Sequence, residues 1–91
     1  MPIYIGEADT TIILDCGAVV TAATLAQIHY RTPSGIEGVW TAAVVGTTEI
    51  YYITVANDLN EAGRWQIQAY VETPDWKGYG DTSSFEVEEP L

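Results

Sequence analysis

The stretch Arg64-Trp65-Gln66-Ile67-Gln68-Ala69-Tyr70-Val71-Glu72 decides the fold class, because its side chains alternate between two faces. One face consists of Trp65, Ile67, Ala69 and Val71, and the other of Arg64, Gln66, Gln68 and Tyr70. A period of two predicts a half-buried β-strand, since successive side chains of a strand point to opposite faces of a sheet. Residues 25–32 repeat the pattern, with Ala26, Ile28 and Tyr30 on one face and Gln27, His29 and Arg31 on the other. Both segments therefore predict strands that bury one face.

Strand-like runs recur on either side of these two segments, at intervals of roughly 8–12 residues with turn residues between them. The expected strands are residues 3–5, 10–16, 25–32, 37–45, 49–55, 64–72 and 81–89. Residues 18–26 contain several alanines and could form a helix, but their β-branched side chains and the missing capping box favour a loop. Seven short strands in a single domain, residues 1–91, predict an all-β fold of two packed antiparallel sheets.

A corner motif overlaps the start of the deciding stretch, in Glu61-Ala62-Gly63-Arg64-Trp65-Gln66-Ile67. It resembles the corner between strands E and F of immunoglobulin domains, where a tyrosine stands two positions before a disulfide cysteine. Trp65 takes the place of the tyrosine and Ile67 that of the cysteine. Because an indole carries no hydroxyl, we expect Trp65 not to make the usual corner hydrogen bond. The expected fold is a seven-strand immunoglobulin-like antiparallel β-sandwich without a disulfide.

The charge of the chain is strongly acidic, with thirteen Asp and Glu residues, three Lys and Arg residues and a net charge of −10. Affinity for nucleic acid comes largely from basic side chains that displace counterions from phosphates, and anionic membranes attract basic segments in the same way. The sequence therefore predicts that neither nucleic acid nor a membrane is a partner. Residues 1–7 lack the basic and long apolar regions of a signal peptide, so we expect synthesis in the cytoplasm.

The residue types needed for catalysis and metal binding are scarce. Cys16 is the single cysteine and His29 the single histidine, so an intramolecular disulfide is excluded and a metal cluster is not expected. We interpret Cys16 as a small buried hydrophobic residue. Motifs for a nucleophile elbow, a phosphate loop or a dinucleotide site do not occur. The sequence thus predicts no catalytic residue, no cofactor and no enzyme; calcium at Asp75 and Asp81 is a weaker alternative to simple solvation.

The loop expected at residues 73–80 is the candidate binding site. It sets Trp76, Lys77 and Tyr79 among glycines at one end of the sandwich, and aromatic side chains displayed on loops serve carbohydrate- and protein-binding sites. In the alternative interpretation Trp76 folds back over the core. A sheet face is a further candidate, because outward-pointing Tyr70 and His29 would form an aromatic surface for an oligomer or a partner.

Two segments resemble a known family. They are Ala23-Thr24-Leu25-Ala26-Gln27-Ile28-His29-Tyr30-Arg31-Thr32-Pro33-Ser34-Gly35, and Asp58-Leu59 with Ala62-Gly63-Arg64-Trp65-Gln66-Ile67-Gln68-Ala69-Tyr70-Val71-Glu72. Both are similar to segments of phage immunoglobulin-like domain proteins, among them the N-terminal domain of phage baseplate upper proteins. The shared features are structural turns and core positions, so the resemblance bears on fold and context more than on activity.

This resemblance implies a non-enzymatic structural or assembly protein of a phage virion, in tail, baseplate or neck, that acts through protein–protein contacts. The implied partners are other virion proteins, with a homo-oligomer left open. The implied location is the host bacterial cytoplasm during assembly and the virion afterwards. Baseplate upper proteins are long, so we expect this chain to be a stand-alone subunit or accessory virion protein. The alternative function is a small module that binds carbohydrate or a host surface through Trp76 and Tyr79.

Overall fold

The chain forms eight β-strands in a computed structural model that describes residues 3–91. In chain order they are β1 (Ile3–Tyr4), β2 (Thr11–Asp15), β3 (Leu25–Arg31), β4 (Glu37–Thr41), β5 (Ala43–Val45), β6 (Glu49–Ile53), β7 (Gly63–Glu72) and β8 (Lys77–Glu88). The first two residues of the expected domain 1–91 lie outside the described residues. Residues 17–24 form bends and turns, which confirms the expected loop. Within residues 3–91 no helix is long and apolar enough to cross a membrane.

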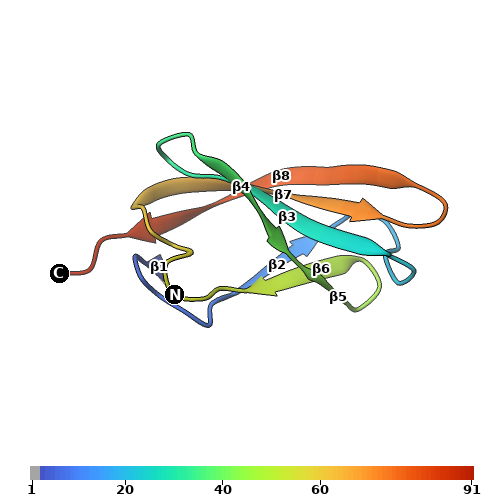
Figure 1. Cartoon of the computed structure of the whole chain (residues 1–91), viewed down its shortest axis with the longest axis horizontal. Helices are drawn as coiled ribbons and strands as arrows, with labels where there is room; N and C mark the ends of the chain where they lie inside the picture. Colours follow the sequence, from blue (N-terminus) through green and yellow to red (C-terminus); the bar gives the residue numbers. More distant parts are fainter. Residues whose placement is uncertain (1–2) are drawn as a thin grey trace.

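The strands form two sheets that face each other in a sandwich-like arrangement (Figure 1). The large sheet has five strands in the order β1-β8-β7-β3-β4, and the small sheet has three in the order β2-β6-β5. β1 runs parallel to β8, with Ile3 opposite Val87. The expectation of purely antiparallel sheets is therefore wrong at this edge. The chain leaves β1 for the small sheet instead of turning back in a hairpin, so β1 and β8 can run in the same direction.

The strand expected at residues 37–45 is two strands in different sheets. β4 pairs with β3 in the large sheet, whereas β5 pairs with β6 in the small sheet. Ala42 marks the change of sheet: its N–H still donates to Ala26 O in the large sheet, over 3.0 Å, before the chain crosses. This crossing makes eight strands where seven were expected. A run of β-forming residues predicts an extended chain but carries no signal for the sheet in which each part pairs.

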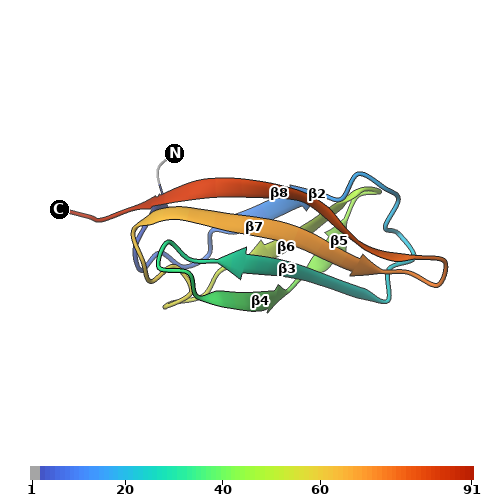
Figure 2. The same cartoon turned by 90° about the horizontal axis from the view of Figure 1, so that it is seen from above.

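The loop expected at residues 73–80 is shorter in the structure, because β8 begins at Lys77. The turn between β7 and β8 closes with a hydrogen bond of 2.7 Å from Thr73 N–H to Trp76 O. Beyond the turn Tyr79 pairs with β7, so the glycines on either side of it lie within a strand. The β7–β8 hairpin reaches past the ends of the neighbouring strands (Figure 2). Its tip is thus an ordered hairpin turn where a longer loop was expected.

A stack of aromatic rings fills the space between the sheets. This interior stack comprises Tyr30, Trp40, Tyr52, Trp65 and Phe85. The Trp40 ring lies nearly parallel to the rings of Tyr52 and Trp65, with centroids 5.0 and 6.1 Å away. Aliphatic side chains surround the stack, and the inward positions predicted for the two alternating stretches are confirmed. Aromatic side chains bury ~150–250 Å² each, so the stack supplies much of the apolar burial of a short chain.

Trp65 also ties the core to the corner before β7. Its side chain is fully buried, and its indole Nε1–H donates to Glu61 O over 3.0 Å. The expectation that Trp65 makes no corner hydrogen bond is therefore wrong. The indole N–H reaches the backbone four residues upstream, much as the tyrosine hydroxyl does in an immunoglobulin corner. This bond matters because a buried donor left without a partner costs about 1–3 kcal/mol.

Candidate binding face

The outward side of the large sheet carries polar and aromatic side chains that could recognise another molecule. The register places His29 on β3 opposite Gln68 on β7. Their chain neighbours Ile28 and Ala69 are buried, so His29 and Gln68 point away from the core. We define the outer face by the outward side chains Gln27, His29, Arg31, Glu37, Val39, Arg64, Gln66, Gln68, Tyr70, Glu72, Lys77, Tyr79, Thr82 and Glu86. The prediction that Tyr70 and His29 point outward is confirmed.

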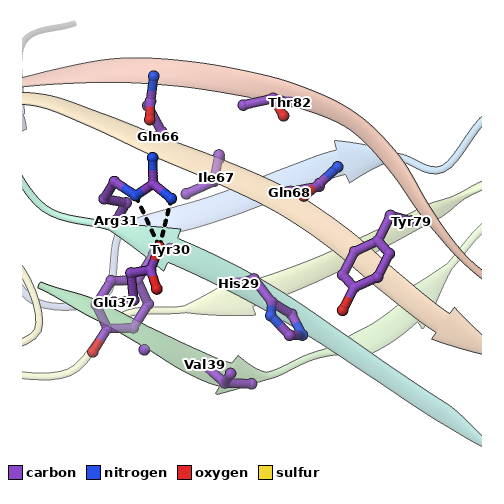
Figure 3. Close-up of a pocket in the computed structure, with 11 residues that line it drawn as sticks. His29, Tyr30, Arg31, Glu37, Val39, Gln66, Ile67, Gln68, Tyr79 and Thr82 are labelled. Carbon is purple, nitrogen blue, oxygen red and sulfur yellow. Dashed lines mark hydrogen bonds and ion pairs between the residues drawn. The ribbon is translucent and has the colours of Figure 1, made fainter. Parts of the chain in front are cut away.

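An open groove with a volume of about 530 Å³ lies on the outer face (Figure 3). Figure 3 shows Arg31 and Glu37 at one end of the groove, Tyr79 at the other and His29 between them. Side chains that can form hydrogen bonds line much of it: Arg31, Glu37, Gln66, Gln68 and Thr82. The groove therefore combines aromatic side chains with hydrogen-bonding ones.

Three aromatic rings from three strands form the centre of the outer face. This outer cluster consists of His29, Tyr70 and Tyr79. The His29 ring lies edge-on to both tyrosines, with centroids 5.7 Å from Tyr70 and 5.4 Å from Tyr79. Tyr79 is 60% exposed, whereas His29 Nε2 is buried without a hydrogen-bond partner among residues 3–91. An unpartnered buried nitrogen costs about 1–3 kcal/mol, so Nε2 is a candidate to accept a hydrogen bond from a bound molecule or to donate one to it.

Ion pairs flank the outer cluster. Arg31 donates to Glu37 Oε2 from Nε over 2.9 Å and from Nη2 over 2.5 Å. The Tyr70 hydroxyl donates to Glu72 Oε2 over 2.7 Å, and this hydrogen bond raises the pKa of Tyr70. Lys77 Nζ lies 4.0 Å from the other oxygen of the same carboxylate. Exposed ion pairs add little to stability, so their main effect is on the charge that this face presents.

The three residues expected to form one binding loop lie on two sides of the large sheet. Trp76 is half-buried and packs against the core, as in the alternative interpretation in which it folds back. Lys77 and Tyr79 lie on the outer face, Lys77 beside Glu72 and Tyr79 beside His29. The structure therefore joins Tyr79 to the outer cluster and separates it from Trp76.

Cys16 and His29 are not brought together. Cys16 directly follows β2 and is partly buried against the core, whereas His29 belongs to the outer face. Burial raises the pKa of the Cys16 thiol, and the carboxylates of Asp15 and Glu49 raise it further. A raised pKa keeps the thiol protonated, and a protonated thiol is a poor nucleophile.

Metal ligands do not cluster in the part of the chain that the structure describes. No group of three or more His, Cys, Asp or Glu side chains there could hold an ion. Asp75, in the turn after β7, and Asp81, within β8, are the two residues considered for calcium, and neither belongs to such a group. The outer face instead offers rings, amides, a hydroxyl and paired charges, which are groups that recognise ligands and protein surfaces.

Most residues that line the groove were not singled out in the sequence. Alternation already put Arg31, Gln66 and Gln68 on the outward sides of their strands. The missing information was that β3 pairs with both β4 and β7, which joins their outward sides into one surface. Val39 and Thr82 gave no local signal at all, because single residues of these types occur on any exposed strand.

No family model, curated protein or solved structure gives a significant match to this chain. The fold and the outer face define its class as a small two-layer β-domain with an aromatic, hydrogen-bonding surface on one sheet.

Proposed function

We propose that the chain is a non-enzymatic, immunoglobulin-like domain protein of a phage virion. In this proposal it acts by contacts with other virion proteins in the tail, baseplate or neck. The order of its strands supports an immunoglobulin-like domain. A role in the virion is supported by residues 23–35 and 58–72, which resemble segments of phage immunoglobulin-like domains.

The strand order supports the immunoglobulin-like class. In immunoglobulin domains strands B, E and D are neighbours in one sheet, and strands G, F and C in the other. The orders β2-β6-β5 and β8-β7-β3 correspond to these, and β4 beside β3 corresponds to the additional C′ strand of variable-type domains. Few two-sheet topologies share this combination of neighbours, so it is the strongest single argument for the class.

The corner at the start of β7 adds support. Trp65 donates to Glu61 O at the place where an immunoglobulin tyrosine makes its corner bond. Ile67, at the position of the second disulfide cysteine, is buried in the hydrophobic core. Apolar packing at this point would serve a domain that folds in a reducing cytoplasm, where disulfides are rare.

The resembling segments also have a structural relation that favours a role in the virion. They comprise β3 with its following turn and the corner with β7, and β3 and β7 pair directly in the middle of the large sheet. The likeness therefore covers one connected part of the domain. An open recognition surface on this sheet and a small rigid fold suit a protein that works by assembly.

Detection of the chain in purified particles tests this function. Virions banded in a density gradient would be digested and analysed by mass spectrometry, with a replication protein of the same phage as the negative control. We expect peptides of this chain in amounts comparable to those of known tail proteins. Its absence from intact particles that retain their tails would overturn the virion proposal.

Recognition of carbohydrate is a second candidate function, favoured by exposed Tyr79 beside hydrogen-bonding groups in the groove. Sugars stack on aromatic rings and bond to planar polar side chains, which this groove supplies. On a glycan array, Tyr79→Ala should then lose binding while Trp76→Ala, on the core side of the sheet, retains it. An array on which the parent chain binds nothing would remove this candidate.

A further inference from the structure

All Lys and Arg residues of the chain lie on the outer face, and each is paired with a glutamate. The pairs are Arg31–Glu37, Lys77–Glu72 and Arg64–Glu86. Because these six charges cancel, the ten other carboxylates account for the whole net charge of −10. Of those ten, only Asp81 and Glu88 belong to strands of the large sheet. The strands of the large sheet therefore carry a net charge of only −2, out of −10 for the whole chain.

Apolar and aromatic surface lies between these ion pairs. The outer cluster occupies the middle of the face, and Val39, opposite His29 on β4, is 47% exposed. Tyr79 is the most exposed ring of the cluster. Burial of such side chains is the main favourable contribution at the centre of a protein interface, where aromatic residues are enriched and charged residues depleted.

The outer face is the larger of the two sheet surfaces. Four strands of about seven residues, at a spacing of about 4.8 Å and a rise of about 3.3 Å per residue, project an area of about 440 Å². The three strands of the small sheet, with about five residues each, project only about 240 Å². Weak protein complexes bury up to about 600 Å² per partner, so both surfaces are within this range and the outer face can bury nearly twice the area.

The distribution of charge favours a second copy of the chain as the partner that binds the outer face. Two chains of net charge −10 repel each other over most of their surfaces. Contact through the small sheet would bring together four like charges, since Asp15 and Glu49 already face each other across β2 and β6. The outer face carries less of this repulsion, and its three ion pairs can complement the same surface related by a two-fold axis. A basic partner would instead be attracted to the unpaired carboxylates elsewhere.

We propose that the outer face is the interface of a weak symmetric homodimer. Val39 and the outer cluster of one copy pack against those of the other, with the ion pairs at the rim. This inference deepens the proposed assembly function by naming a surface and its occupant. It is tested on the purified chain alone, so a monomeric result would overturn the dimer and leave detection in virions as a separate question.

Sedimentation equilibrium of the parent chain tests the dimer directly. The protein would be measured from about 10 µM to about 1 mM, the range in which weak interfaces associate. We expect the dimer fraction to rise with concentration and also with salt up to about 0.5 M, because salt screens the net repulsion between the copies. A monomer over the whole range, at both low and high salt, would overturn the proposal.

A matched pair of variants locates the interface. Val39→Lys lies on the outer face, and Ile13→Lys makes a similar change on the small sheet, where Ile13 is 52% exposed. Each variant gains one positive charge, so their net charges are equal. We expect Val39→Lys to weaken the dimer at least about tenfold and Ile13→Lys to leave it unchanged or slightly tighter. Loss of the dimer in Ile13→Lys but not in Val39→Lys would overturn the assignment. If Val39→Lys does not fold, Tyr79→Lys is judged by the same criteria.

Discussion

Two aromatic groups lie on opposite sides of the same sheet, and they differ in almost every physical respect. Rings of the interior stack lie close and nearly parallel around Trp40, and Trp65 in this stack is fully buried with its N–H satisfied. In the outer cluster the His29 ring meets both tyrosines edge-on, Tyr79 is largely exposed, and His29 Nε2 has no hydrogen-bond partner among residues 3–91. The burial of apolar area explains the first group completely. The second group buries less of its ring area and leaves one nitrogen open to a hydrogen bond from another molecule.

One step along a strand separates the two roles. On β3, Tyr30 points into the interior stack while its neighbour His29 belongs to the outer cluster. On β7 the same relation holds between Trp65 and Tyr70, which differ by an odd number of positions. Aromatic character by itself therefore says little about function, and the side of the sheet decides.

The largest effect is expected when one ring is removed from each group and the two losses of stability are compared. Trp65→Ala should lower the free energy of unfolding by about 3–5 kcal/mol, the usual cost of deleting a buried aromatic side chain. Tyr79→Ala should change it by no more than about 0.5 kcal/mol, as surface substitutions do. Urea denaturation followed by circular dichroism measures both. Equal losses would mean that the outer cluster is as much a part of the fold as the interior stack.

A smaller effect is expected from adding a methyl group beneath the interior stack. A Cβ at Gly38 would collide with the Tyr30 ring, so Gly38→Ala should cost about 1–3 kcal/mol. Gly80→Ala is the matched control in β8, because its Cβ would lie on the core side of the sheet at an ordinary 3.6 Å from Ala69 Cβ. There alanine should be neutral or stabilise by up to about 1 kcal/mol. The melting temperatures of both variants, measured by thermal unfolding, test this difference. A Gly38→Ala variant as stable as the parent chain would contradict tight packing at Tyr30.

Two tyrosine hydroxyls that bond to carboxylates sharpen the contrast further. Burial, with the hydrogen bond of 2.6 Å to Asp58, raises the pKa of Tyr52 in the interior stack to about 12. Its stabilising effect should be complete below pH 10, the ordinary pKa of tyrosine, and be lost as the pH rises through about 12. Tyr52→Phe should cost about 1–2 kcal/mol at neutral pH and remove this alkaline loss. Tyr70→Phe, which loses an exposed hydrogen bond to Glu72, should lower stability less than Tyr52→Phe does. A larger loss in Tyr70→Phe would contradict the difference between the two aromatic groups.

The smallest expected effect concerns the exposed side of the corner. The Glu61 carboxylate accepts hydrogen bonds from Ser34 Oγ over 3.0 Å and from Ser34 N–H over 3.2 Å, and the first of these lowers the pKa of Glu61. The resulting stabilisation should be present above pH 4.5, the ordinary pKa of this carboxyl, and be lost as the pH falls through its lowered pKa. Ser34→Ala should flatten this part of the acid unfolding profile, measured by intrinsic tryptophan fluorescence. An unchanged profile would show that the bond does not contribute.

Local pattern was sufficient for much of the fold. Alternation predicted the inward and outward sides of β3 and β7, and turn residues predicted the breaks between most strands. Predictions from local pattern failed at two places where the residue type suggested a different structure. The glycines around Tyr79 indicated a loop, although both lie within β8: Gly78 packs beneath the ring of Trp76, and Gly80 packs against Ala69 and the backbone of Cys16. The indole of Trp65 was expected to leave the corner bond unmade, but an N–H can donate as well as a hydroxyl.

What the sequence alone determined is the set of extended segments and the two sides of each, because side-chain direction along a strand is a local property of the backbone. The tertiary structure decided which of these sides meet. It divided residues 37–45 between two sheets, set β1 parallel to β8, and joined His29, Tyr70 and Tyr79 from three strands into one surface. These outcomes depend on pairing between distant segments, which is selected by the burial of the whole core, and no local period encodes it.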